Sequence, residues 1–146
     1  MTTTVSDAEA AVKTLLGTNW DSNNVTEPTW ILSEDQKQAR TDTQDLAIIY
    51  PEPDGNKVTQ DGCFFDFINT EYLVSIDLRS NLSRARINAL RTEAMRLIYA
   101  YRRSPGTGFH IIDAEDHGRD YSNRRTKQWR IVITVSLKMY SKAKSE

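Results

Sequence analysis

The sequence predicts one α+β domain, in which two helices pack on one face of a mostly antiparallel sheet that ends in a long C-terminal β-hairpin. Two segments have helical spacing of apolar residues, and residues 129–140 show a period of two, with an apolar side chain at every second position. A chain of 146 residues is long enough for one hydrophobic core without cross-links. We therefore expect residues 1–146 to form a single domain, with a flexible tail at 141–146.

The first helix is expected near the N-terminus. Ser6 and Glu9 have the S-x-x-E spacing of a capping box, and Gly17 is a typical C-terminal stop. One face of this segment collects its apolar residues, which are Ala8, Ala11, Val12, Leu15 and Leu16. Such a short amphipathic helix needs a sheet to cover its apolar face.

The second helix has the clearest pattern in the chain. Asn81 or Ser83 can cap its start, and the Ser-Pro-Gly-Thr-Gly sequence at 104–108 ends it. Its buried stripe is predicted to contain Ile87, Leu90, Ala94, Leu97, Ile98 and Tyr101.

Short apolar or alternating segments predict the strands. A turn rich in Pro, Asp and Gly at 51–56 separates two groups of them, and a bend at Asn69-Thr70 could join two strands into one. The predicted strands cover residues 29–33, 46–50, 63–68, 72–78, 109–113 and 129–140.

A long charged loop is predicted to connect the last two strands. Residues 115–127 exceed the two to five residues of most hairpin loops, and unstructured loops of about 12 residues or more are usually functional or disordered. Arginine and aromatic residues are typical of protein interfaces. The predicted interface residues are Arg119, Tyr121, Arg124, Arg125 and Lys127.

Composition limits the class of protein. Cys63 is the only cysteine, which rules out an internal disulfide and fits a reducing compartment. The N-terminus lacks the basic start and apolar run of a signal peptide, and no stretch approaches the roughly 18 apolar residues of a membrane helix. We expect a soluble product made in the cytoplasm, without a membrane partner.

Charge is divided unevenly along the chain. The net charge is -1, but residues 1–77 hold 14 acids and 4 bases, whereas residues 78–146 hold 6 acids and 15 bases. This division, -10 against +9, fits nucleic-acid binding through the basic half or head-to-tail assembly of copies. A third interpretation is that the two halves neutralise each other within one subunit.

No residue pattern indicates an enzyme. Asp116, His117 and Asp120 carry metal-ligand chemistry, but D-H-x-x-D is a weak spacing, and a solvated loop explains it more simply. Cys63 lies beside Phe64 and Phe65, an apolar setting that favours a small buried hydrophobe over a reactive thiolate. There is no phosphate-binding glycine motif. We expect no catalytic residues, no metal and no cofactor.

Nucleic-acid binding is the main alternative. Seven arginines and one acid, Glu93, lie between Arg79 and Arg103, and the loop 115–130 adds further bases. Arginines on an exposed helix face would neutralise phosphates, although a pI near 6.1 is low for a dedicated binder. On the helix segment 81–103, this alternative assigns the contacts to Arg84, Arg91, Arg102 and Arg103.

The order of these segments resembles a known group of viral proteins. The segment "VSIDLRSNLSRARINALRTEAMRLI", then "GFHIIDAED" and a strongly alternating last strand, resembles the tail terminator and neck proteins of long-tailed phages and related viruses. The resemblance is one of pattern and size, covers most of the chain and includes no diagnostic motif. That group has no catalytic residues to transfer to this sequence.

The resemblance implies a structural virion protein made in the host cytoplasm. Copies would form a ring, usually of about six, that ends growth of the tail tube and joins the tail to the head connector. DNA would pass through the lumen without sequence recognition. Loop 115–127 and residues 33–45 would supply contacts to the tube, a neighbouring subunit or the channel. The sequence does not separate a terminator from a stopper or another neck protein.

Overall fold

The computed structural model describes residues 8–32, 45–51, 57–61, 67–106, 108–123 and 125–142. Its elements follow one another along the chain as α1 (Ala8–Asn19), β1 (Thr29–Leu32), β2 (Leu46–Pro51), β3 (Lys57–Asp61), β4 (Phe67–Ser80), α2 (Arg84–Ala100), β5 (Ile111–Asp120) and β6 (Trp129–Lys142).

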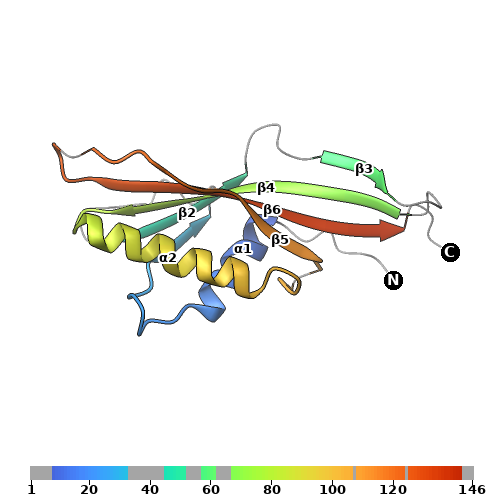
Figure 1. Ribbon diagram of the computed structural model, residues 1–146, viewed down its shortest axis with the longest axis horizontal. Coiled ribbons are helices and arrows are strands. Elements are labelled where there is room, and N and C mark those ends of the chain that lie inside the picture. The colour runs from blue at the N-terminus through green and yellow to red at the C-terminus, as the bar shows by residue number, and fades with distance from the viewer. Residues whose placement is uncertain are drawn as a thin grey trace.

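All described strands belong to one sheet with the order β1-β2-β4-β6-β5, and β3 pairs with the first part of β4. Only the β1–β2 pair is parallel, and every other pair is antiparallel. β3, residues 67–71 and residues 138–142 form a three-stranded end that extends past both helices (Figure 1). The predicted fold class, with its long C-terminal hairpin, is confirmed.

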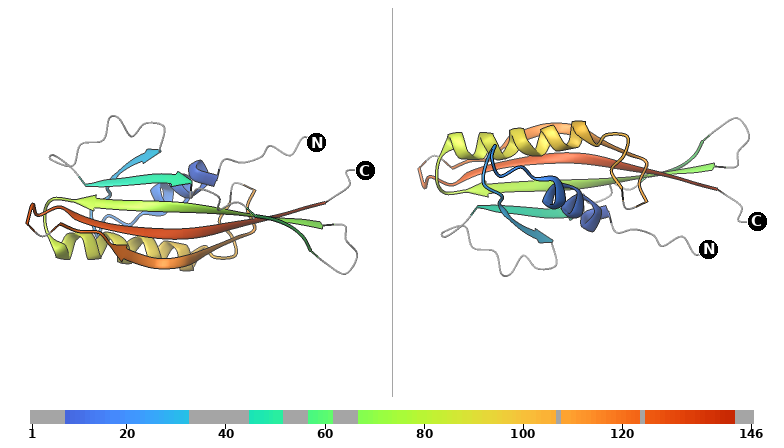
Figure 2. Two further views of the ribbon diagram at one scale, coloured as in Figure 1. Left: turned by 90° about the horizontal axis from the view of Figure 1, so that it is seen from above. Right: turned by 90° about the horizontal axis from the view of Figure 1, so that it is seen from below.

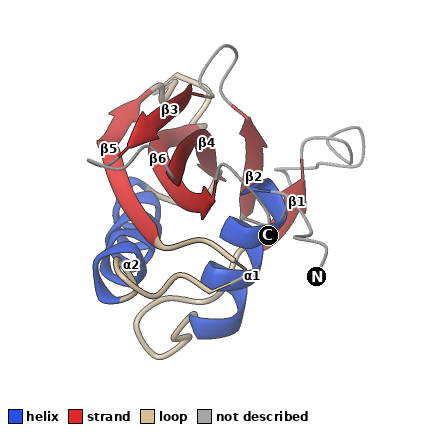
Figure 3. Cartoon of the chain, turned by 90° about the vertical axis from the view of Figure 1, so that its right-hand side faces the viewer, coloured by secondary structure: helices blue, strands red, loops and turns tan. Residues whose placement is uncertain are grey.

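Both helices cover the same face of the sheet (Figures 1 and 3). α2 packs beneath β4, β5 and β6, while α1 packs beneath β1, β2 and β4, as the views from above and below show (Figure 2). The predicted alternation supplies the sheet side of this core, because Val74, Ile76 and Leu78 of β4 pair with buried Val135, Ile133 and Ile131 of β6.

The two predicted helices are present, with one wrong boundary. The five predicted apolar residues of α1 are buried, but the helix passes Gly17 and ends at Asn19, whose side-chain Nδ2 donates to the carbonyl of Leu15. Ser6, the expected cap, lies outside the described residues. Ser83 caps α2 by accepting from the backbone N–H of Arg86. Tyr101 follows the helix and is only partly buried.

The strand predictions were wrong in three places. β5 continues to Asp120, so the predicted loop 115–127 is half strand, and the connection spans only 121–128. β3 was not predicted. β6 includes Ser141 and Lys142 of the expected tail. β4 runs unbroken through the proposed bend at 69–70, and residues 52–56, 62–66 and 143–146 lie outside the described part.

Two irregularities interrupt the pairing of β5 with β6. The β5–β6 register shifts between Ala114 and Asp116 and again between Asp116 and Arg119. Gly118 lies in the second shift with a φ of 124°. A β-carbon there would lie 2.8 Å from Cγ2 of Ile131 and 2.9 Å from Cδ of Arg91. Glycine at this bulge therefore allows helix and strand to approach closely.

Glu93 anchors the chain between α1 and β1 onto α2. Its carboxylate accepts from the backbone N–H of Asp21 at 2.9 Å and from Asn24 Nδ2 at 3.0 Å, and it pairs with Arg96 at 2.6 Å. The side chain is 1% exposed. The Arg96 hydrogen bond is the main cause that lowers the pKa of Glu93 to about 2.

Replacing Gly118 with alanine should destabilise the fold by about 2–4 kcal/mol, since the new methyl group combines a steric clash with an unfavourable φ. Gly106→Ala is the matched control, because Gly106 also has a positive φ but open space around it. It should cost about 1–2 kcal/mol. Urea unfolding of both variants measures the difference. Equal losses would contradict the close approach at Gly118.

Acidification should remove the contribution of Glu93 to stability between about pH 4.5 and pH 2. Its pKa is lower in the folded than in the unfolded chain, so the contribution is complete above pH 4.5 and disappears as the pH falls to about 2. Glu93→Gln should abolish this part of the pH dependence, which is worth roughly 3 kcal/mol. Chemical unfolding at several pH values checks it, with Glu115→Gln as the exposed control. Parallel curves for Glu93→Gln and the unmodified chain would refute this role.

Candidate protein interface

The face of the sheet opposite the helices carries a cluster of charged side chains. Strand register places Asp77, Val132 and Arg119 in one row across β4, β6 and β5, and places Arg79 beside Arg130 in the next row of that face. Alternation on β4 and β6 directs these side chains away from the helix-covered core. We call Asp77, Arg79 and Arg130 the arginine cluster.

One buried carboxylate joins the two arginines of the cluster. Arg130 donates from Nε to both oxygens of Asp77, at 3.0 and 3.1 Å, and its Nη2 lies 2.8 Å from Oδ2. Arg79 donates only from Nη2 to Oδ2, at 2.9 Å. The Asp77 side chain is 1% exposed, while those of Arg79 and Arg130 are 29% and 39% exposed.

The arginine cluster holds more positive charge than Asp77 neutralises. Hydrogen bonding to Asp77 raises the pKa of Arg130 further above its usual value. Guanidinium groups are not deprotonated in proteins, so within the described residues the cluster carries one uncompensated positive charge. Nε of Arg79 is buried and has no hydrogen-bond partner among the described residues. An unmet buried donor costs about 1–3 kcal/mol.

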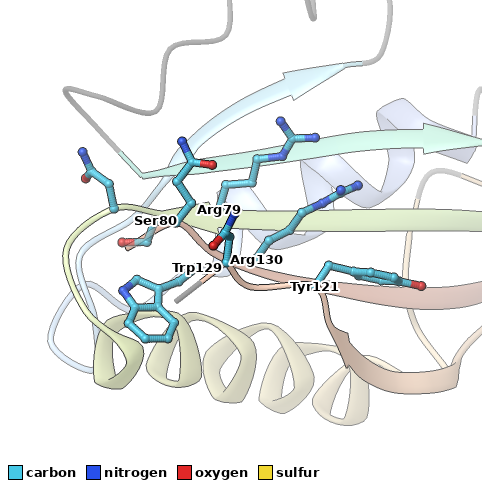
Figure 4. Close-up of a pocket in the computed structure, with 8 residues that line it drawn as sticks. Arg79, Ser80, Tyr121, Trp129 and Arg130 are labelled. Carbon is cyan, nitrogen blue, oxygen red and sulfur yellow. The ribbon is translucent and has the colours of Figure 1, made fainter. Parts of the chain in front are cut away.

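Two pockets lie on either side of Arg130 and Tyr121, which line both of them. The first, of about 310 Å³, lies between the end of β4 and the hairpin connection. In Figure 4, Arg79 and Arg130 extend side by side across the sheet, with Trp129 below them on the helix side. The second pocket, of about 380 Å³, lies over β6 and is also lined by Tyr50 and Arg119.

Hydrogen bonds fix the base of the hairpin connection to Arg130. Its guanidinium lies 5.4 Å from the centre of the Tyr121 ring, within cation–π range. The backbone N–H of Tyr121 donates to the carbonyl of Arg130, and the Ser122 hydroxyl accepts from the N–H of Arg130. The position of the connection is thus tied to the arginine cluster.

The predicted interface residues have different environments. Arg119 is on β5 and pairs with Asp116 at 2.7 Å. The pKa of Asp116 is lowered mainly by the hydrogen bond that its carboxylate accepts from the backbone N–H of Gly118. Tyr121 is 53% exposed beside Arg130. Arg125 and Lys127 are exposed in the connection, whereas Arg124 lies outside the described residues.

The arginines assigned to nucleic-acid binding do not form one patch. Arg84 starts α2, Arg91 packs against Gly118, and Arg102 and Arg103 follow the other end of the helix. Positions 84 and 102 are separated by about 27 Å at the helical rise per residue. Arg102 also pairs with Asp113 at 3.3 Å.

Part of the charge division is neutralised within the subunit. Arg86 pairs with Asp45, and both Arg79 and Arg130 pair with Asp77, so bases of the second half meet acids of the first half. The other described ion pairs, including Arg96 with Glu93, join residues of the second half. In the described parts of the chain, only two acids of residues 1–77 are paired in this way.

Sequence reasoning missed the arginine cluster. From the sequence, Asp77 is a member of an alternating strand, and Arg79 and Arg130 are counted among the bases available to nucleic acid. The available signal is that Asp77 and Arg79 share one face. The contact with Arg130 depends on the β4–β6 register, which brings residues 79 and 130 opposite each other.

Asp116 and His117, which carry metal-ligand chemistry in the sequence, have other partners in the structure. Across the described ranges, no group of three or more His, Cys, Asp and Glu residues could hold a metal ion. Asp116 is instead engaged by Gly118 and Arg119, and His117 contacts Tyr99 with ring centroids 6.3 Å apart. None of the described helices is long and apolar enough to span a bilayer.

Asp77→Asn should destabilise the subunit by about 3–5 kcal/mol, because it leaves two partly buried guanidinium groups facing a neutral amide. Asp113→Asn is the matched control, since it breaks only the exposed pair with Arg102 and should cost less than about 1 kcal/mol. Denaturant midpoints of the two variants provide the comparison. Similar small losses would show that Asp77 is not required to hold the two arginines.

Comparison with solved structures finds a chain of similar fold. This chain resembles a chain in the virion of a native gene transfer agent (GTA) particle, with a TM-score of 0.58 and 11% sequence identity. The match covers 92% of this chain and 95% of that one. No protein-family model and no curated protein matches. At this level of identity, the likeness shows a shared fold.

Proposed function

We propose that this protein is a structural, non-enzymatic virion protein that forms a ring at the head-proximal end of a viral tail. The ring ends growth of the tail tube and joins the tail to the head connector. The observation that supports this proposal best is the likeness to a GTA virion chain over nearly the whole length of both chains. The order of helices and strands in the sequence supports it as well.

The helix-free face gives the proposal a physical basis. It combines arginines and Tyr121 beside two pockets, and the partly exposed Trp129 lines the first pocket from the helix side, a composition found at the centres of protein interfaces. We assign this face and the hairpin connection to contacts with neighbouring copies, the tube protein or connector proteins. DNA passes through the lumen without specific contacts.

Nucleic-acid binding by α2 is the less favoured alternative. Of the seven arginines between 79 and 103, Arg79, Arg86, Arg96 and Arg102 already pair with carboxylates. Paired arginines release fewer counterions from DNA, which lowers the affinity that this mode of binding can supply.

Light scattering and electron microscopy of the purified chain should find a ring of about six copies. Arg125→Glu combined with Lys127→Glu should prevent assembly while leaving the unfolding temperature unchanged, because both side chains are exposed in the connection. Lys13→Glu with Arg103→Glu makes the same charge change elsewhere and should still assemble. A strictly monomeric native chain would refute the ring.

Measuring DNA affinity as a function of salt concentration distinguishes the proposed function from nucleic-acid binding by α2. The proposal expects weak binding at physiological salt. Tight binding with a steep salt dependence, lost in an Arg84→Gln and Arg103→Gln variant, would favour the nucleic-acid function instead.

A further inference from the structure

We propose that the first pocket binds one carboxylate side chain from a neighbouring copy of this chain, with Arg79 as the residue that receives it. This inference rests on the proposed function in one respect, which is that copies assemble. The pocket is bounded by Arg79, Arg130, Tyr121, Trp129 and the hairpin connection (Figure 4).

Within the arginine cluster, Arg79 is the residue whose positive charge Asp77 does not neutralise. Arg130 alone contacts both oxygens of Asp77, with Nε and Nη2, and so satisfies that carboxylate by itself. Arg79 adds one further contact from Nη2. Loss of that contact would leave Asp77 paired, so Arg79 can turn to a second carboxylate without abandoning a buried charge.

The donors of Arg79 support the same assignment. Its Nε is buried and finds no hydrogen-bond partner in the part of the chain that the structure describes. Nε and an Nη of one guanidinium form a fork that matches the two oxygens of a carboxylate. A rotation of the guanidinium toward the pocket would give Nε a partner and place two donors on the incoming group.

The lining of the pocket fits the end of one acidic side chain. Asn123 and Gln128 contribute amides at the rim, and Trp129 and Tyr121 contribute aromatic surfaces. A volume of about 310 Å³ lies at the lower end of ligand pockets. Duplex DNA would instead need a row of unpaired cations to follow its backbone.

The charge of the chain indicates the source of the carboxylate. Residues 1–77 hold 14 acids against 4 bases. Asp45 and Asp77 of that set pair with arginines of the same chain. The excess of acids in the sequence of the first half makes a second copy the source of the carboxylate that this proposal assigns to the pocket. Contacts between two different surfaces are those that close a ring.

Gln128→Glu tests the pocket without altering the arginine cluster. The substitution is nearly isosteric and places a carboxylate in the pocket lining, where it competes with the incoming one. Thr126→Glu is the matched control, because residue 126 is in the same exposed connection and is not part of that lining. Sedimentation velocity should show self-association weakened about tenfold or more by Gln128→Glu relative to Thr126→Glu, with equal unfolding temperatures for both.

Nuclear magnetic resonance tests Arg79 directly. The Nε–H signal of Arg79, assigned by its loss in Arg79→Lys, is followed in dilute chain during titration with N-acetylglutamate amide or with inorganic phosphate. The expected result is a saturable shift with the glutamate probe that exceeds the shift with phosphate. A larger response to phosphate, or none to glutamate, would overturn the proposal.

The two measurements separate failure of the pocket from failure of the ring. Assembly that is equally strong in Gln128→Glu and Thr126→Glu would refute carboxylate binding by the pocket without contradicting ring formation. A native chain that stays monomeric while Arg79 responds to glutamate would refute both the ring and the second copy as occupant.

Discussion

The pairing of β4 with β6 is the constraint on which both faces of the sheet depend. It continues without a shift from Phe67 opposite Lys142 to Ser80 opposite Trp129. Because side chains alternate, a slip of one residue would exchange the two faces. Asp77 would then enter the apolar layer against the helices, and Ile76 would take its buried place beside the arginines. The hydrophobic core and the arginine cluster are therefore fixed by the same register.

The fold was more predictable from the sequence than the candidate site, for reasons that individual residues make clear. Helical spacing identified the stripe of α2, and strict alternation identified β6, because each pattern is local. β5 lacks such a pattern, since its two register shifts and Gly118 break the period of two. The arginine cluster joins Asp77 to a residue 53 positions away, a contact that only the register reveals.

The distribution of charge has two physical roles that a net value of -1 conceals. Pairs such as Arg86 with Asp45 hold the start of α2 to the start of β2, at modest net gain, since desolvation offsets much of the attraction. The first half of the sequence holds ten more acids than bases, and the second half holds nine more bases than acids. Under the proposed function, one chain would carry both partners of a complementary contact.

Arg130 connects these features because it belongs to the core and to the surface. Its guanidinium holds the buried carboxylate of Asp77 and lies against the ring of Tyr121. Its backbone N–H and carbonyl bond Ser122 and Tyr121, the first residues of the connection. A connection held in this way loses less conformational entropy on binding than a free loop. In the proposed interface, the position of the connection therefore depends on the carboxylate of Asp77, which is buried on the strand beside β6.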